Sequence, residues 1–167
     1  LEILSIIVAT FFFGGIVEAS IDARASGRGK KIEHRLSALI RVVAAFTLSF
    51  AIPILSTTPL PYMIVYQSAY FAALLYGYWV SFDPSYNIVR QGLENIWYVG
   101  KTSVTDKVFI NSFGADGKLY FIIKVMFLIS TLIGFEVGII FISVSLVCQL
   151  MFWFILWMKY YISNKNR

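Results

Sequence analysis

Long apolar runs alternate with short polar segments along this chain, and the runs have the length of membrane spans. A helix needs about 20 mostly apolar residues to cross a hydrocarbon core of roughly 30 Å. Such runs cover residues 3–21, 36–57 and 62–82, and a longer one covers 119–158. The pattern predicts an all-α integral membrane helical bundle, with residues 1–167 in a single transmembrane domain.

The run from 119 to 158 is too long for a single span. As one helix it would reach about 60 Å, roughly twice the hydrocarbon thickness. The segment Gly134-Phe135-Glu136-Val137-Gly138 divides it into spans 119–134 and 138–158, joined by a tight turn with a charge at its centre. This gives about five transmembrane helices. The short fourth span and the Gly-x-x-x-Gly spacing leave a tilted or broken single helix as the alternative.

The positive charges favour five spans over four. All 14 Lys and Arg residues fall within residues 24–41, 90–124 and 159–167, and five spans place all three groups on one side. Because a Lys/Arg excess marks cytoplasmic loops, we expect the N-terminus outside and the C-terminus in the cytoplasm, most simply in a bacterial inner membrane. The four tryptophans fall near the same boundary, as interfacial aromatic belts do: Trp79, Trp97, Trp153 and Trp157.

Composition agrees with this class and changes how the net charge is interpreted. The chain is 59% hydrophobic and 14% charged, whereas soluble domains are about 45–50% apolar and about 25% charged. Its net charge of +5 flanks membrane segments, so we expect contact with anionic lipid head groups and not with nucleic acid. Cys148 is the one cysteine, which excludes an intrachain disulfide.

Two segments connect the expected spans on the basic side. Residues 22–31 contain glycines, basic residues and small polar residues, which predicts a flexible loop. Residues 83–118 predict a cytoplasmic loop with two short amphipathic interfacial helices. The first would start at Asp83, with Pro84 at its first position. The second would start at the capping box from Ser103 to Asp106.

Three charged residues within the spans predict an intramembrane polar site. Glu18 and Arg41 lie near the cytoplasmic ends of two consecutive antiparallel spans, so they could form an ion pair, and Lys124 lies at comparable depth. Charges within a membrane usually face a bundle interior or an aqueous cavity. The alternative is that all three extend to the head groups as independent side chains.

A second candidate site lies at the interface and contains His34, Asp83 and Asp106. The two aspartates could act as an acid–base pair or bind a divalent ion, although each also has a structural explanation as a helix-start residue. His34 lacks the spaced ligands of a zinc site. Gly100-Lys101-Thr102 lacks the earlier glycine of a phosphate-binding loop. We therefore expect no catalytic residue, metal ion or cofactor.

Residues 82–106 carry a family resemblance. Phe82-Asp83-Pro84, Asn87, Arg90, the run from Trp97 to Ser103, and Asp106 resemble a segment of small polytopic membrane proteins from Bacteroidetes and their phages. The resemblance implies a multi-pass membrane protein with this loop facing the cytoplasm.

Three function classes follow. The first is a non-enzymatic subunit or accessory component of a larger membrane assembly, with other membrane subunits or further copies of the chain as partners. The second is a channel, transporter or phage-type pore, favoured by Pro53 within the second span and by a Glu18–Arg41–Lys124 group. The third is a lipid-modifying enzyme.

Overall fold

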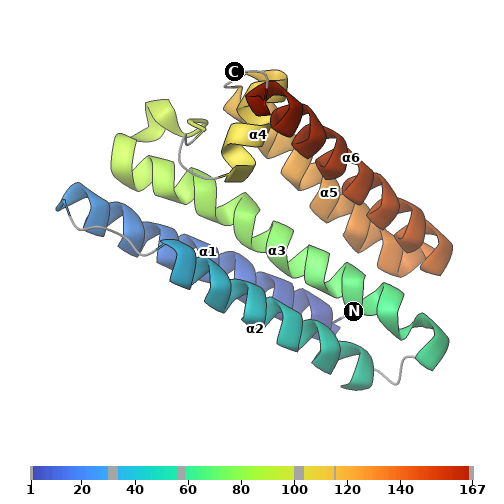
Figure 1. The fold of residues 1–167 in the computed structure, drawn as a ribbon. Coiled ribbons are helices and arrows are strands. Elements are labelled where there is room, and N and C mark those ends of the chain that lie inside the picture. The colour runs from blue at the N-terminus through green and yellow to red at the C-terminus, as the bar shows by residue number, and fades with distance from the viewer. Residues whose placement is uncertain (1, 30–33, 56–58, 100–103, 115, 166–167) are drawn as a thin grey trace.

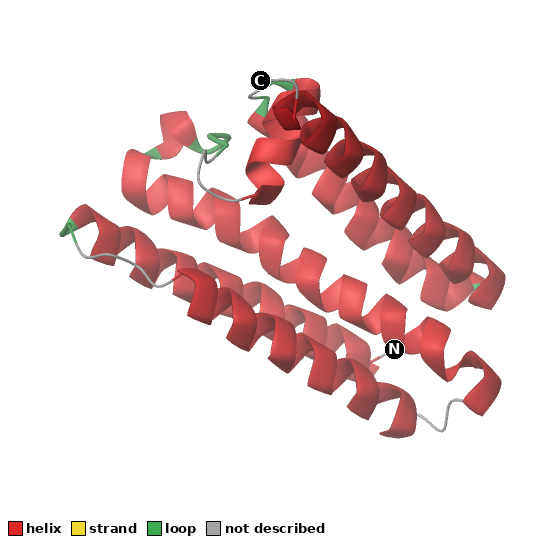
Figure 2. Cartoon of the chain, in the orientation of Figure 1, coloured by secondary structure: helices red, strands yellow, loops and turns green. Residues whose placement is uncertain are grey.

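A computed structural model describes residues 2–29, 34–55, 59–99, 104–114 and 116–165, and these residues form an all-α fold (Figures 1 and 2). Six α-helices and one short 3-10 turn follow one another along the described chain. They are α1 (Glu2–Gly27), α2 (His34–Leu55), α3 (Leu60–Gln91), the 3-10 turn η1 (Leu93–Asn95), α4 (Val104–Phe113), α5 (Gly117–Val137) and α6 (Ile139–Lys165).

Helix α3 is the central element of the bundle. It packs most extensively against α1 and also contacts α2, α5 and α6. Helices α1 and α2 lie on one side of α3, and the antiparallel pair α5 and α6 lies on the other, with the short α4 packed near one end (Figure 1). The fold therefore has two helical halves that meet along α3.

Three helices are long and apolar enough to cross a membrane. They cover Ser5–Gly27, Gly117–Val137 and Ile139–Lys165, and a shorter apolar stretch of α2 covers Ala38–Ile52. Most side chains of these stretches lie on the outside of the bundle, including large apolar ones such as Phe13, Leu150 and Phe154. A soluble monomer rarely exposes so much contiguous apolar surface. The protein is thus built as a multi-pass membrane protein.

The predicted division of residues 119–158 is confirmed. Helix α5 ends at Val137 and α6 begins at Ile139, with Gly138 between them at φ 120°. This φ lies in a region that favours glycine. A Cβ on Gly134 would lie 2.7 Å from Ile142 Cγ1, so glycine at 134 lets the two helices approach closely just beside the turn.

The prediction of a flexible loop at residues 22–31 is wrong for its first part, because α1 continues to Gly27. The added turns are held by tertiary contacts. Asp22 and Ala23 are buried, and the Arg90 guanidinium of α3 donates a hydrogen bond to Ser26 Oγ. Residues 30–33 lie outside the described chain.

The prediction that a new helix starts at Asp83 is also wrong. Helix α3 runs without a break through Asp83 and Pro84 to Gln91. An internal proline removes one helical hydrogen bond, but the extension gains others: Asn87 Nδ2 donates to the carbonyls of Ile96 and Tyr98 at 3.0 and 2.8 Å. The first expected interfacial helix is therefore the end of α3, followed by η1.

The second helix expected in this loop is present as α4. Its proposed cap, Ser103, lies outside the described residues, and Asp106 lies in its first turn. Phe109 of α4 is fully buried beside Val99 and Tyr120, with Trp153 of α6 packed against the same cluster. This packing attaches α4 to the α5–α6 half.

Small residues allow α1 and α3 to approach each other. Gly15, Ala19 and Ala23 recur every fourth residue on α1 and are buried, as are Ala69, Ala73 and Gly77 on α3. Such small-x-x-x-small spacing brings helix backbones together in membranes, where packing replaces the hydrophobic effect as the driving force. The interface therefore depends on the absence of larger side chains.

Neighbouring glycines of α1 provide a test of this packing. A Cβ on Gly15 would lie 2.2 Å from Ser81 Oγ and 2.8 Å from the Tyr78 carbonyl oxygen, whereas a Cβ on Gly14 has nothing within 4 Å. We expect Gly15→Ala to lower the free energy of unfolding by about 1–3 kcal/mol. Gly14→Ala should be neutral, or stabilising by up to about 1 kcal/mol. Thermal unfolding in mild detergent measures both, and equal effects would contradict the close packing.

Candidate functional site

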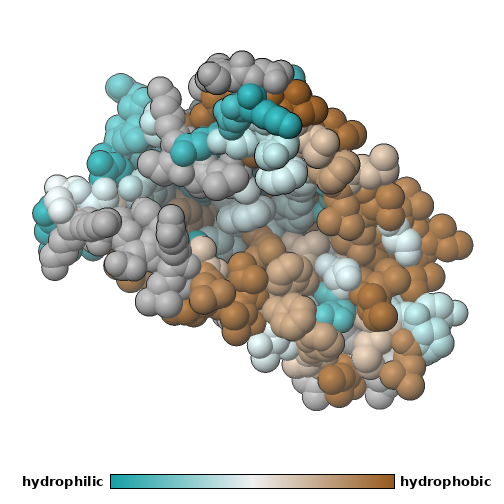
Figure 3. Space-filling view, viewed as in Figure 1, coloured by the Kyte–Doolittle hydropathy of each residue, from teal (hydrophilic) through white to brown (hydrophobic). Residues whose placement is uncertain are grey.

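Charged side chains gather at one end of the bundle, where α1 and α3 end and α5 begins. Most of the hydrophilic surface on the visible face lies at this end, and hydrophobic surface covers much of the remainder, with smaller hydrophilic areas within it (Figure 3). Within the bundle, two separate ion pairs lie at this end on opposite flanks of α3. They are the starting point for a functional site.

The first ion pair joins the three helices of the N-terminal half. Arg41 Nη2 of α2 lies 2.6 Å from Glu18 Oε1 of α1. The Tyr78 hydroxyl of α3 donates a hydrogen bond of 2.9 Å to the other carboxylate oxygen of Glu18. The Arg41 guanidinium also lies over the Tyr78 ring, 4.7 Å from its centroid. With 20% and 28% of the Arg41 and Glu18 side chains exposed, the pair is largely enclosed by protein.

The second ion pair joins α3 to α5. Lys124 Nζ of α5 binds Asp83 Oδ2 of α3, and the Lys124 side chain is only 4% exposed. The ammonium group also lies 3.6 Å from the centroid of the Tyr120 ring and 5.8 Å from that of Trp79. A buried lysine is costly unless it is paired and surrounded by such partners.

Helix α4 brings a second carboxylate to this cluster. The Tyr120 hydroxyl lies near the side chains of Thr105 and Asp106, and it is also within the electrostatic influence of Asp83. Asp83, Lys124, Tyr120 and Asp106 thus form one group of titratable side chains, contributed by three helices.

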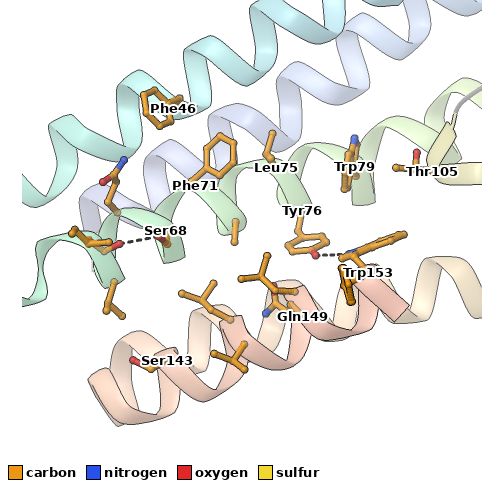
Figure 4. Close-up of a pocket in the computed structure, with 18 of the residues that line it drawn as sticks. Phe46, Ser68, Phe71, Leu75, Tyr76, Trp79, Thr105, Ser143, Gln149 and Trp153 are labelled. Carbon is orange, nitrogen blue, oxygen red and sulfur yellow. Dashed lines mark hydrogen bonds between the residues drawn. The ribbon is translucent and has the colours of Figure 1, made fainter. Parts of the chain in front are cut away.

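A large groove lies between α3 and α6, beside this cluster (Figure 4). Its volume is about 870 Å³, and its walls are mainly apolar side chains of α3 and α6. Phe46 of α2 and Thr105 and Val108 of α4 complete the lining. Across the groove, Trp153 Nε1 donates a hydrogen bond of 2.9 Å to the Tyr76 hydroxyl.

A polar network between α5 and α6 was not predicted from the sequence. The amide nitrogen of Gln149, which is 4% exposed, lies 3.0 Å from both Thr131 Oγ1 and Ser145 Oγ. Ser145 Oγ in turn donates to Ser130 Oγ at 3.0 Å. Hydroxyl and amide side chains often join helices in membranes in this way. Sequence analysis did not single out Gln149 because its neighbours in the sequence are apolar. Its four-residue spacing from Ser145, which places both side chains on one face of α6, could have indicated the network.

In the structure, the residues of the two predicted candidate sites are grouped differently from the prediction. The expected contact between Glu18 and Arg41 is present, but Lys124 is bound to Asp83 on the other flank of α3. Asp83 and Asp106 lie near the same tyrosine. His34 begins α2, and its side-chain contacts lie outside the described part. Among the described residues, no group of three His, Cys, Asp or Glu is placed to hold a metal ion.

The two clusters differ in their chemical capacity. Glu18 is bound by a guanidinium and a phenol, so this cluster mainly fastens three helices together. The second cluster holds two carboxylates, an ammonium and a phenol next to the apolar groove. Such groups are able to exchange protons with, or hydrogen-bond to, the polar part of an apolar molecule.

Comparison of the chain with protein-family models, curated proteins and solved structures finds no match in any of the three.

The first ion pair can be tested with a double-mutant cycle of Glu18→Gln and Arg41→Gln. Removing one partner leaves the other charge uncompensated in a low-dielectric site, whereas removing both avoids this cost. We expect a coupling free energy of about 1–3 kcal/mol from unfolding in mild detergent. Additive losses would mean that the two side chains act independently at the membrane surface.

Proposed function

We propose that the protein is a five-span, non-enzymatic integral membrane protein that serves as a subunit or accessory component of a larger membrane assembly. In this proposal α1, α2, α3, α5 and α6 cross the bilayer of a bacterial inner membrane. The N-terminus and the Gly138 turn lie outside, and α4 and the C-terminus lie on the cytoplasmic side.

Length and the position of charge support this placement. Helix α3 is about 48 Å long at 1.5 Å per residue, enough to cross a roughly 30 Å core and extend beyond it. The exposed basic residues Arg28, Lys107, Lys118 and Lys159 all belong to segments on the proposed cytoplasmic side. Glu136 belongs to the opposite end, next to the Gly138 turn. This distribution follows the positive-inside rule.

The observation that supports an assembly is the outer face of α1. Thr10 and Gly14 are exposed and lie one helical turn apart, and a Cβ on Gly14 would have no neighbour within 4 Å. The Thr10 hydroxyl is already satisfied by the Ile6 carbonyl at 2.8 Å. Small residues on an apolar helix face let a second transmembrane helix approach closely. Gly15 and Ala19, by contrast, are buried within the bundle, so α1 carries small residues on both its inner and its outer face.

The two other function classes have less support. The pore was favoured by Pro53 within the second span and by a Glu18–Arg41–Lys124 group, and Lys124 contacts Asp83 instead of this pair. The lipid-modifying enzyme is still supported by one observation, the titratable cluster beside the groove, which consists of Asp83, Asp106, Tyr120 and Lys124.

The topology is tested with single cysteines in a Cys148→Ser background. We expect Arg28→Cys, Lys118→Cys and Asn164→Cys to be shielded from an impermeant thiol reagent added outside, and Glu136→Cys to be labelled, because basic segments stay in the cytoplasm. All four positions are exposed at the surface of the bundle. Labelling of Asn164→Cys together with shielding of Glu136→Cys would overturn the five-span arrangement.

The assembly is tested with Gly14→Leu. Because the position faces open space, the variant should fold with unchanged thermal stability but lose the membrane proteins that co-purify stoichiometrically with the native chain in mild detergent. The matched control is Ala44→Leu, which enlarges an exposed position on α2. Retention of the same partners by Gly14→Leu, or the absence of any stoichiometric partner of the native chain, would contradict the proposal.

A further inference from the structure

Two deeply buried side chains in the wall of the α3–α6 groove have hydrogen-bonding capacity that the described protein does not use. They are Gln149 of α6 and Tyr76 of α3, which are 4% and 7% exposed. The large majority of buried polar atoms have a hydrogen-bond partner. Unused capacity in the wall of a groove therefore indicates the chemistry of a ligand.

The side-chain oxygen of Gln149 is an acceptor without a donor among the described residues. Its amide nitrogen donates to Thr131 Oγ1 and Ser145 Oγ. The hydroxyl groups around it cannot donate in return: Thr131 and Ser130 donate to the Phe127 carbonyl, and Ser145 donates to Ser130. This arrangement fixes which end of the amide is the nitrogen, so Gln149 Oε1 is left as an acceptor.

The Tyr76 hydroxyl has the complementary capacity. Its oxygen accepts the 2.9 Å hydrogen bond from Trp153 Nε1, and within the described chain its own O–H has no acceptor. Gln149 lies one turn before Trp153 on α6, and Figure 4 shows Tyr76 and Gln149 on the two walls of the groove at the same level. One unused donor and one unused acceptor therefore lie close together.

Other polar lining residues do not have this character. The hydroxyls of Ser68 and Ser143 donate to the Ile64 and Ile139 carbonyls of their own helices, each at 2.8 Å. Gln67, which also lines the groove, is only half-buried.

The lining also determines the charge of a ligand. Among the described lining residues there is no Lys, Arg, His, Asp or Glu. A charged group would therefore enter an apolar site without a counter-charge, which is strongly unfavourable. Ligand sites of this size, about 870 Å³, are typically apolar with a few polar groups that fix the orientation of the ligand.

A hydroxyl is the smallest neutral group that both donates and accepts a hydrogen bond through one atom. We propose that the groove binds one neutral lipid whose polar part is a free hydroxyl. The ligand oxygen accepts from the Tyr76 O–H and donates to Gln149 Oε1, and the hydrocarbon chain lies along the apolar side chains of α3 and α6.

A serine or threonine of a partner helix is the competing source of such a hydroxyl. The backbone groups of a membrane helix are satisfied within the helix, so a docked helix would reach Tyr76 and Gln149 only through a side chain. Because both residues are almost fully buried, a slender chain with a terminal hydroxyl reaches them more directly than the side of a helix. The proposal does not depend on the assembly through α1, since Gly14 lies outside the lining and Gly14→Leu should leave ligand binding unchanged.

Quenching of tryptophan fluorescence by ω-bromoundecanol in mild detergent tests the site. Bromine quenches tryptophan on contact, and Trp79, Trp153 and Trp157 line the groove. Two matched probes have the same chain: the methyl ether of this alcohol accepts a hydrogen bond but cannot donate one, and bromoundecane does neither. The alcohol should quench saturably and bind about fivefold more tightly than the ether, the ratio equivalent to the roughly 1 kcal/mol of one hydrogen bond. The ether should exceed bromoundecane by a similar factor.

Three variants assign the two hydrogen bonds. Gln149→Leu removes the acceptor and should reduce the alcohol-to-ether ratio to about one. Tyr76→Phe removes the donor and should weaken the alcohol and the ether alike while leaving bromoundecane unchanged. The matched control is Ser143→Ala, which removes a lining hydroxyl already bound to the Ile139 carbonyl and should preserve all three affinities.

Thermal unfolding separates loss of the site from loss of the fold. Gln149→Leu also removes contacts with α5, whereas the Tyr76→Phe test is independent of them. Equal quenching by the three probes in the native chain would overturn the proposal, as would unchanged probe affinities in a folded Tyr76→Phe. The proposal would also fail if both variants lost a stoichiometric partner protein without any change in alcohol binding, because the two groups would then serve a partner helix.

Discussion

Helix α3 contacts charged side chains on both of its flanks near the basic end of the bundle, and the packing of the other helices depends on how these charges are paired. Tyr78 donates to Glu18, whose carboxylate also binds Arg41, and five residues later Asp83 binds the buried Lys124. In hydrocarbon, a charge without a partner costs several kcal/mol. The two ion pairs therefore fix the register of α1 and α2 on one flank and of α5 on the other.

The same requirement explains why α3 continues past the point where its sequence predicts an end. Asp83 would serve as a helix cap if the chain turned there, but its carboxylate is used by Lys124. Farther along, Arg90 binds Ser26 and Asn87 binds two carbonyls of the segment after η1. These contacts offset the hydrogen bond lost at Pro84. Tertiary contacts thus decide a boundary that local signals assign to a new helix.

The sequence predicted features that depend on local pattern or simple topology. The apolar runs predicted the long helices. The length of the run 119–158 and the charged segment from Gly134 to Gly138 predicted the break between α5 and α6. Consecutive antiparallel spans predicted the contact of Glu18 with Arg41. The Asp83–Lys124 contact joins residues 41 positions apart and depends on how the two halves pack, so depth alone grouped Lys124 with the wrong partner. The groove depends on the shapes of two helices that are far apart in sequence, and no residue pattern along either one predicts it.

The central position of α3 explains why its hydropathy is lower than that of the candidate spans although it lies at the centre of the bundle. Composition singles out α1, α5 and α6 as candidate spans, whereas α3 is richer in tyrosine and other polar side chains. A helix contacted by four others presents much of its surface to protein, and its polar groups are satisfied there: Ser81 donates to the Tyr78 carbonyl, and Tyr76 accepts from Trp153. Side chains that face lipid have no such partners and must be apolar. Under the five-span proposal, the lower hydropathy of α3 is therefore the expected consequence of its place at the centre of the bundle.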